Sequence, residues 1–255
     1  MQELWEILKT LDYSPLWISL KTGLVATVIC FFLGVWTARS VMHMGKRAKA
    51  LVDGFLTLPM VLPPTVAGFF LLLIFSLRRP VGTFLYQELS IKVVQTWLGC
   101  ILAASVIAFP LMYRNARAAF EQVDIELIYA GRTLGMSERK IFWRVVLPSA
   151  GPGVVSGTIL TFARALGEYG ATSMLAGNIA GKTGTISQRI AMVIQNGDYR
   201  TAGLWVAIIL LISFGIVVVM NLFADANLKN IVGFLVDPHI QALHGALHGA
   251  AGHGL

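Results

Sequence analysis

The sequence predicts an all-α membrane protein with about five transmembrane helices. Of the 255 residues, 56% are hydrophobic and only 13% are charged, whereas a soluble domain carries about 25% charged residues. The apolar residues also gather in five windows, each close to the length of helix that crosses ~30 Å of hydrocarbon. In so apolar a chain, we interpret the net charge of +7 as basic residues of cytoplasmic loops that face anionic lipid, and we exclude nucleic-acid binding.

The five apolar windows differ in regularity. They cover residues 15–38, 51–77, 95–113, 151–175 and 202–223. Pro59, Pro63 and Pro64 interrupt the second window, and a proline removes a helix donor and kinks the chain. Such a break is tolerated at membrane depth only where it is buried in protein or lines a wet cavity. The segment 178–203 is too polar to span, so we expect a re-entrant or surface helix around residues 190–194.

The flanking charges predict the orientation. Segments 39–50, 114–149 and 224–255 hold 11 Lys and Arg residues, against 7 on the opposite side. Basic residues favour the cytoplasm, so we predict an N-terminus outside and a cytoplasmic C-terminus. Three regions follow: an outer interfacial amphipathic segment at 1–13, a transmembrane domain at 14–225 and a disordered cytoplasmic tail at 226–255.

Two opposite charges lie inside the fourth window. Arg164 and Glu168 are four residues apart and therefore share one helix face. Ionisable groups within a span are costly, face the bundle interior and pair with one another. Two interpretations stay open: the pair fixes helix register, or it lines a pore in which Arg164 attracts an anion. Gly167 and Gly170 would allow close helix approach.

Patterns of catalytic or metal-binding residues are missing from the predicted spans. The sequence has no Gly-x-x-x-x-Gly-Lys-Ser/Thr loop, so we expect the chain not to hydrolyse ATP itself. His244 and His248 are four apart in the tail, which its Gly and Ala content predicts to be disordered. We therefore predict no cofactor, no metal site and no enzyme activity, with energy supplied by a partner.

The segment 121–148 between the third and fourth windows is the most informative. Its pattern predicts two short helices joined at Gly135, with Ser137 capping the second and Pro148 ending it. The second helix places Ile141, Phe142, Val145 and Val146 on one face and basic residues on the other. This predicts a docking surface for a partner; the alternative is a helix that lies on the lipid surface.

The run Ala130-Gly-Arg-Thr-Leu-Gly135, followed by Leu147-Pro148, resembles the EAA loop of bacterial ABC importer permeases. The resemblance implies a cytoplasmic coupling helix that sits in a groove of the ATP-binding subunit. Ile128 occupies the family's glutamate position, so the salt bridge of that contact is not implied. The residues assigned to coupling are Ala130, Gly131, Leu134, Gly135, Ser137, Ile141, Phe142, Leu147 and Pro148.

Three further runs, at 58–68, 162–172 and 177–186, look like those of molybdate permeases. The resemblance implies a homodimer in the bacterial inner membrane that works with two ATP-binding cassette subunits and an extracytoplasmic molybdate-binding protein, surrounded by lipid. The candidate pore and gate residues are Pro63, Pro64, Arg164, Gly167, Glu168 and Gly170. Tungstate is indistinguishable from molybdate here. The alternatives are sulfate or thiosulfate as the anion, or a stand-alone channel or intramembrane enzyme, for which segment 121–148 would be dispensable.

Overall fold

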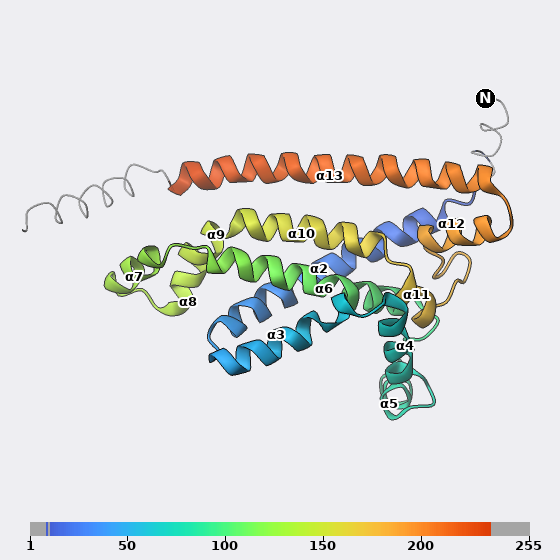
Figure 1. Ribbon diagram of the computed structural model, residues 1–255, viewed down its shortest axis with the longest axis horizontal. Coiled ribbons are helices and arrows are strands. Elements are labelled where there is room, and N and C mark those ends of the chain that lie inside the picture. Colours follow the sequence, from blue (N-terminus) through green and yellow to red (C-terminus); the bar gives the residue numbers. More distant parts are fainter. Residues whose placement is uncertain (1–8, 10, 236–255) are drawn as a thin grey trace, which may run out of the picture.

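The structure, a computed structural model, describes residues 9 and 11–235 and is helical throughout the regular elements of that part. Helices α2 (Ser14–Met42), α6 (Trp97–Glu121) and α10 (Gly151–Leu166) lie alongside one another, and α13 (Tyr199–Leu235) runs along one side of this bundle (Figure 1). The predicted all-α class is therefore confirmed. Most of the predicted interfacial segment 1–13 and the tail from residue 236 lie outside the described residues, whereas α13 extends beyond residue 225.

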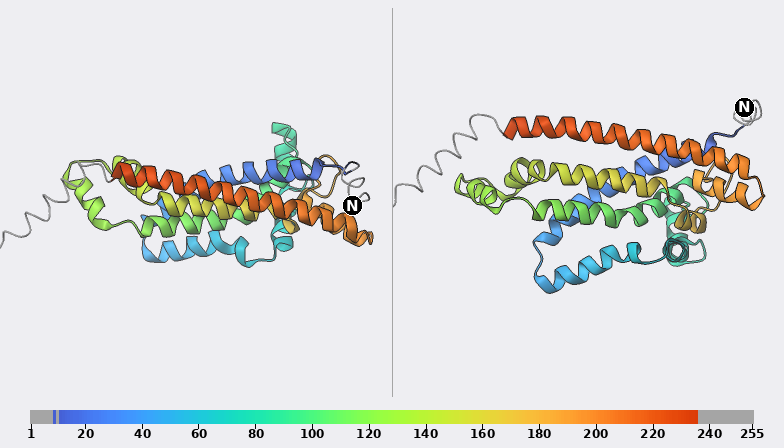
Figure 2. Two further views of the ribbon diagram at one scale, coloured as in Figure 1. Left: turned by 90° about the horizontal axis from the view of Figure 1, so that it is seen from above. Right: turned by 45° about the horizontal axis from the view of Figure 1, so that its top comes forward.

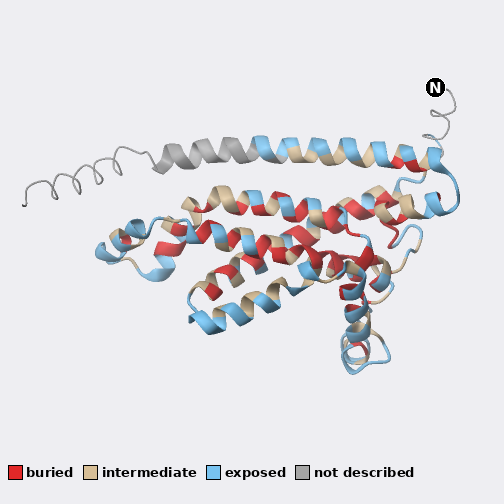
Figure 3. Ribbon diagram, viewed as in Figure 1, coloured by how far each residue is buried: buried red, intermediate tan, exposed pale blue. Residues whose placement is uncertain are grey.

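Helix α6 is the centre of the bundle, because α2 and α10 both pack against it (Figure 2). Small residues make the contacts close. A Cβ added to Gly34 of α2 would lie 2.7 Å from Cγ of Met112, and one added to Gly157 of α10 would lie 2.6 Å from Cβ of Asn115. Membrane helices associate through such small residues. The buried positions accordingly concentrate in α2, α6 and α10 (Figure 3).

The apolar windows do not all become straight spans. By length and composition, α2, α6 and the Tyr199–Val219 part of α13 are each able to cross a membrane. The second window forms α3 (Lys46–Val61) and α4 (Pro64–Phe75), which are bent by 109° at the predicted proline break. The fourth window also breaks, because α10 ends at Leu166 and α11 (Gly170–Leu175) follows. The described part therefore contains three candidate spans, or up to five if each bent pair is one span.

Short helices occupy the two ends of the bundle (Figure 1). One end, here called the α12 end, carries α4, α5 (Pro80–Leu89), α11 and α12 (Ile186–Gln195). Helix α12 begins with a capping box of Thr185 and Gln188 and provides the helix expected in the polar segment 178–203. The other end, here called the α7 end, carries α7 (Ile125–Thr133), α8 (Glu138–Ile141), the π-helix η1 (Phe142–Val146) and α9 (Leu147–Ser149).

Candidate functional site

The segment 121–148, here called the coupling loop, contains the predicted pair of helices joined at Gly135. Asp124 caps α7 by accepting a hydrogen bond from the Glu126 amide at 2.9 Å. At its other end, the Gly135 amide donates to the Arg132 carbonyl and the Met136 amide donates to the Gly131 carbonyl. This is a Schellman motif, and it requires the left-handed φ of 71° that Gly135 adopts. Glycine meets that requirement without strain.

The second half of the coupling loop is one continuous helical stretch with a π-helical centre. Ser137 caps α8, as predicted, by accepting from the Lys140 amide at 3.4 Å. The stretch ends at Ser149, one residue after the predicted Pro148, and the axis then turns by 69° into α10. Arg132 donates to Glu138 at 2.7 Å and so joins the two halves. This hydrogen bond, together with the charge of Glu138, raises the pKa of Arg132.

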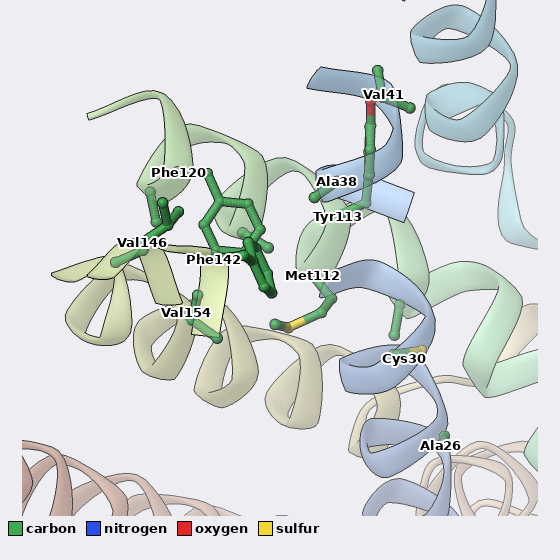
Figure 4. Packing of buried hydrophobic residues seen from close by; sticks show 14 of the residues in the cluster. Ala26, Cys30, Ala38, Val41, Met112, Tyr113, Phe120, Phe142, Val146 and Val154 are labelled. Atoms are coloured by element: carbon green, nitrogen blue, oxygen red, sulfur yellow. The ribbon is translucent and has the colours of Figure 1, made fainter. Parts of the chain in front are cut away.

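The apolar face of the second helix points inward, which corrects the prediction that it faces a partner. Ile141 is 1% exposed and Phe142 is 7% exposed. Ile141 packs against Gly131, where an added Cβ would lie 3.1 Å from Cγ1 of Ile141. Val145 and Ile128 are half-buried against the same core cluster, which Figure 4 shows around Phe120 and Phe142. The periodicity correctly identified an apolar face, but this face packs against the chain's own core.

Other apolar side chains of the coupling loop are exposed. Ile125 is 57% exposed, Tyr129 is 53% exposed and Leu134 is 66% exposed, all in or directly after α7. Trp143 is 57% exposed on the second half of the loop. Gly135 is exposed as well, with no atom near the position of its missing Cβ. The outward apolar surface of the coupling loop therefore lies mainly on α7.

Arg164 and Glu168 pair at the break between α10 and α11. Nη1 of Arg164 lies 2.8 Å from Oε2 of Glu168. The second carboxylate oxygen of Glu168 accepts a hydrogen bond from the Ala171 amide, also at 2.8 Å. The Glu168 residue is 3% exposed, whereas the Arg164 side chain is 32% exposed. Glu168 therefore holds both the arginine and the start of α11.

Two of the sequence runs meet at the α12 end, where α11 packs against α4. A Cβ added to Gly170 would lie 3.1 Å from Cβ of Pro64, which begins α4 beside Pro63. A Cβ added to Gly68 would lie only 2.6 Å from Cα of Ala171. A Cβ added to Gly167, in contrast, would meet no atom more closely than the Ala163 carbonyl oxygen, at 3.6 Å. The pore candidates from positions 63–64 and 164–170 thus gather in one region, at the opposite end of the bundle from the coupling loop (Figure 1).

Sequence reasoning missed a polar cluster that ties α3 to α6. Asp53 accepts a hydrogen bond from Tyr113 and forms an ion pair with Arg117. Glu121 pairs with Arg117 at 2.9 Å and with Lys49 at 2.7 Å. The (i, i+4) spacing of Arg117 and Glu121 was the signal in the sequence, but their partners on α3 could not be read from it.

An apolar cavity of about 690 Å³ separates α3 and α4 from α2 and α6. Its lining includes Cys30 of α2, Phe55 of α3, Leu62 directly after α3, and Phe109 of α6. Among the residues that the structure describes, there is no cluster of three or more His, Cys, Asp or Glu side chains able to hold a metal ion. The cavity is thus an apolar space between helices.

Comparison with known proteins finds transport permeases. The family described as "Binding-protein-dependent transport system inner membrane component" matches residues 31–231. The "Molybdenum transport system permease protein ModB" of Escherichia coli K12 is 40% identical over 189 residues, covering 74% of this chain and 82% of that protein. The "Sulfate transport system permease protein CysT" of Salmonella typhimurium is 33% identical over 216 residues, covering 85% and 78%.

A likeness to solved structures supports the fold. The inward-facing MetNI methionine ABC transporter matches with a TM-score of 0.62 at 18% identity, covering 90% of this chain and 98% of that chain. At this identity the similarity concerns the arrangement of helices alone. The order of helices described above is therefore one that ABC transporters use.

Proposed function

Because the chain belongs to the family of binding-protein-dependent transport system inner membrane components, we propose that it is the permease subunit of an ATP-driven molybdate importer. As a multi-pass inner-membrane subunit, it carries the pathway for the substrate and no catalytic site. The observation that carries the choice of molybdate is the 40% identity with a named molybdenum permease, against 33% with a named sulfate permease. Two runs that resemble those of molybdate permeases also meet where α4 packs against α11.

The assembly in this proposal contains two copies of the chain, two ATP-binding subunits and an extracytoplasmic binding protein. The α7 end faces the cytoplasm, and the N-terminus lies outside. The distribution of charge supports this orientation: Lys46, Arg47, Arg114, Arg139 and Lys140 are exposed at the α7 end. Positive residues near the ends of spans favour the cytoplasmic side.

The docking site for the ATP-binding subunit is the outward face of α7. This face has an apolar surface formed by Ile125, Tyr129 and Leu134. At the Schellman turn, Gly135 has no side chain, so the backbone of a partner can approach closely there. An amphipathic helix that lays its apolar side into a groove is a common form of recognition. The remaining coupling residues have structural roles inside the segment. Gly131 packs against Ile141, and Ser137 caps α8. Ala130 belongs to α7, and α9 begins with Leu147 and Pro148.

Transport follows alternating access. ATP binding closes the two ATP-binding subunits and draws the coupling loops together, and the pore then opens outward; hydrolysis resets it. At the α12 end, Arg164 attracts the oxyanion, because its side chain is partly exposed while its carboxylate partner is buried. Glu168 sets the geometry of the arginine and of α11, and the contact of Gly170 with Pro64 links this region to α4.

Uptake of labelled molybdate into proteoliposomes that contain the assembled importer tests the proposal. We expect ATP-dependent uptake that excess unlabelled molybdate removes and that a tenfold excess of sulfate leaves within about twofold of the control. The second candidate is a sulfate permease, which the similarity to CysT favours. Sulfate uptake with molybdate as the poor competitor would establish that candidate and reject the first.

A further inference from the structure

We propose that Arg39, stacked on Phe142, is a positioning residue that transmits movement of the coupling loop to α2. The inference rests on the proposed function, because it assumes that an ATP-binding subunit moves the loop. Arg39 lies in the last turn of α2, and the centre of its guanidinium group lies 3.9 Å from the centroid of the Phe142 ring. This is well within the ~6 Å over which a cation is attracted to an aromatic face.

Phe142 is the point where the coupling loop meets both neighbouring spans. Its ring lies edge-on to that of Phe120 on α6, with centroids 5.5 Å apart, while Arg39 reaches it from α2. Within the described part of the chain Arg39 forms no ion pair, so the ring is the group that orients its charge. The apolar contacts of Ile141 and Val146 stabilise the position of the loop but are not directional. The contact of Arg39, in contrast, depends on where the Phe142 ring lies.

Phe142 also begins the π-helix η1, which runs to Val146. A π-helical turn is rare, and it is frequently found at functional sites. Here the wider turn lies between α8, which follows the exposed part of the loop, and the 69° bend into α10. A displacement of α8 therefore moves Phe142 before it moves α10. The contact between Phe142 and Arg39 then transmits this movement to α2.

Helix α2 connects this contact to the opposite end of the bundle. It is 29 residues long, and near its start Ser19 Oγ accepts a hydrogen bond from the Ile186 amide at 2.8 Å. Thr22 Oγ1 accepts one from Nε1 of Trp97 at 2.9 Å. The same helix thus contacts the coupling loop, the start of α6 and the segment that follows α11. A chain of packed and hydrogen-bonded groups of this kind can carry coupling between distant sites.

Arg39→Met and Phe142→Leu test the contact, because Met keeps the apolar stem of the arginine without the cation, and Leu keeps an apolar side chain without the ring. We expect both variants to retain the ATP-binding subunit and to hydrolyse ATP, while molybdate imported per ATP hydrolysed falls about fivefold in proteoliposomes. The double variant is expected to fall no further than either single one, because the two changes remove one interaction. Lys21→Met is the matched control: Lys21 lies 5.0 Å from the Trp17 ring at the other end of α2, and its variant should keep the wild-type ratio.

An unchanged import ratio in the assembled Arg39→Met complex would overturn the inference, as would additive losses in the double variant. If Phe142→Leu fails to assemble, Arg39→Met decides alone, because Arg39 is half-exposed at the end of its helix. A failure of the proposed function can be told apart from a failure of this inference. If the wild-type complex imports sulfate and not molybdate, the choice of molybdate is wrong, and sulfate imported per ATP hydrolysed is measured instead.

Discussion

Glu168 uses its two carboxylate oxygens on different partners, Arg164 and the Ala171 amide. The sequence predicted the first contact from the spacing of four residues. It did not predict the second, because the pattern gave no sign that the helix ends between them. Replacing Glu168 by an apolar residue would leave a buried amide donor unsatisfied, which costs about 1–3 kcal/mol. Any test of the ion pair must therefore keep a hydrogen-bond acceptor at position 168.

The combination Arg164→Leu with Glu168→Gln meets that condition, because glutamine keeps the oxygen for Ala171 and no unpaired charge remains. If the pair served packing alone, this variant would fold and import molybdate normally. Since we assign the anion to Arg164, we expect an assembled complex whose molybdate uptake falls at least about tenfold. Uptake by proteoliposomes is the measurement, with Glu168→Gln alone as the control. Near-normal uptake by the double variant would leave both residues with a structural role only.

At the scale of elements, α3 is only loosely integrated into the fold. It has no buried residue, and the apolar cavity separates much of it from α2 and α6. Its polar attachments to α6 are those of Lys49 and Asp53, in the first half of the helix. An element with few buried contacts opens more readily than the rest of a structure. The Asp53 cluster is therefore the tether that sets the position of α3.

The two cysteines make this testable. Cys30 lines the cavity beside α3, whereas Cys100 is buried at the start of α6, with its Sγ 3.6 Å from the Thr183 carbonyl. We expect Asp53→Ala to raise the rate of Cys30 labelling by a maleimide about tenfold, since loss of the tether frees α3. Cys100 should react at an unchanged rate. Each cysteine is followed in a chain that has the other replaced by alanine.

Glu138→Ala is the matched control, because it removes an exposed carboxylate from a different ion pair. Equal acceleration at both cysteines would indicate general loosening and contradict the role of Asp53 as a local tether.

The elements also show how far sequence reasoning reaches. The prolines at 59, 63 and 64 predicted a break, and the structure has it between α3 and α4. The angle of 109° was not predictable, because the contact of α4 with α11 sets it. In the coupling loop, periodicity found the apolar face of Ile141 and Phe142 but assigned it to a partner. A pattern states that a face is buried; it does not state whether the covering surface belongs to the same chain.

At the scale of the whole molecule, the two candidate regions occupy opposite ends of the bundle (Figure 1). The coupling loop lies at the α7 end, and the contact of α4 with α11 lies at the α12 end. Helices α2, α6 and α10 join them, and their closeness depends on small residues along the contacts. The proposed mechanism requires these ends to face the two sides of the membrane.

Cysteine labelling in intact cells tests that requirement. In a background without Cys30 and Cys100, Lys182→Cys is exposed at the α12 end and Lys46→Cys is exposed at the α7 end. We expect a membrane-impermeant maleimide to label the Lys182→Cys variant directly, and the Lys46→Cys variant only after permeabilisation, because basic residues favour the cytoplasmic side. The reverse pattern would invert the proposed orientation.

The close contact at Gly68 restricts which sequences evolution can reach. At Gly153, an added Cβ would meet the Ala119 Cβ at 2.6 Å, so a lineage could exchange the two residues, with alanine at one position and glycine at the other. At Gly68 the opposing atoms are Cα and the carbonyl oxygen of Ala171, at 2.6 and 2.9 Å, and every amino acid has both. No substitution at position 171 compensates for a larger residue at position 68. Position 68 therefore has to remain glycine in every descendant that keeps α4 packed against α11.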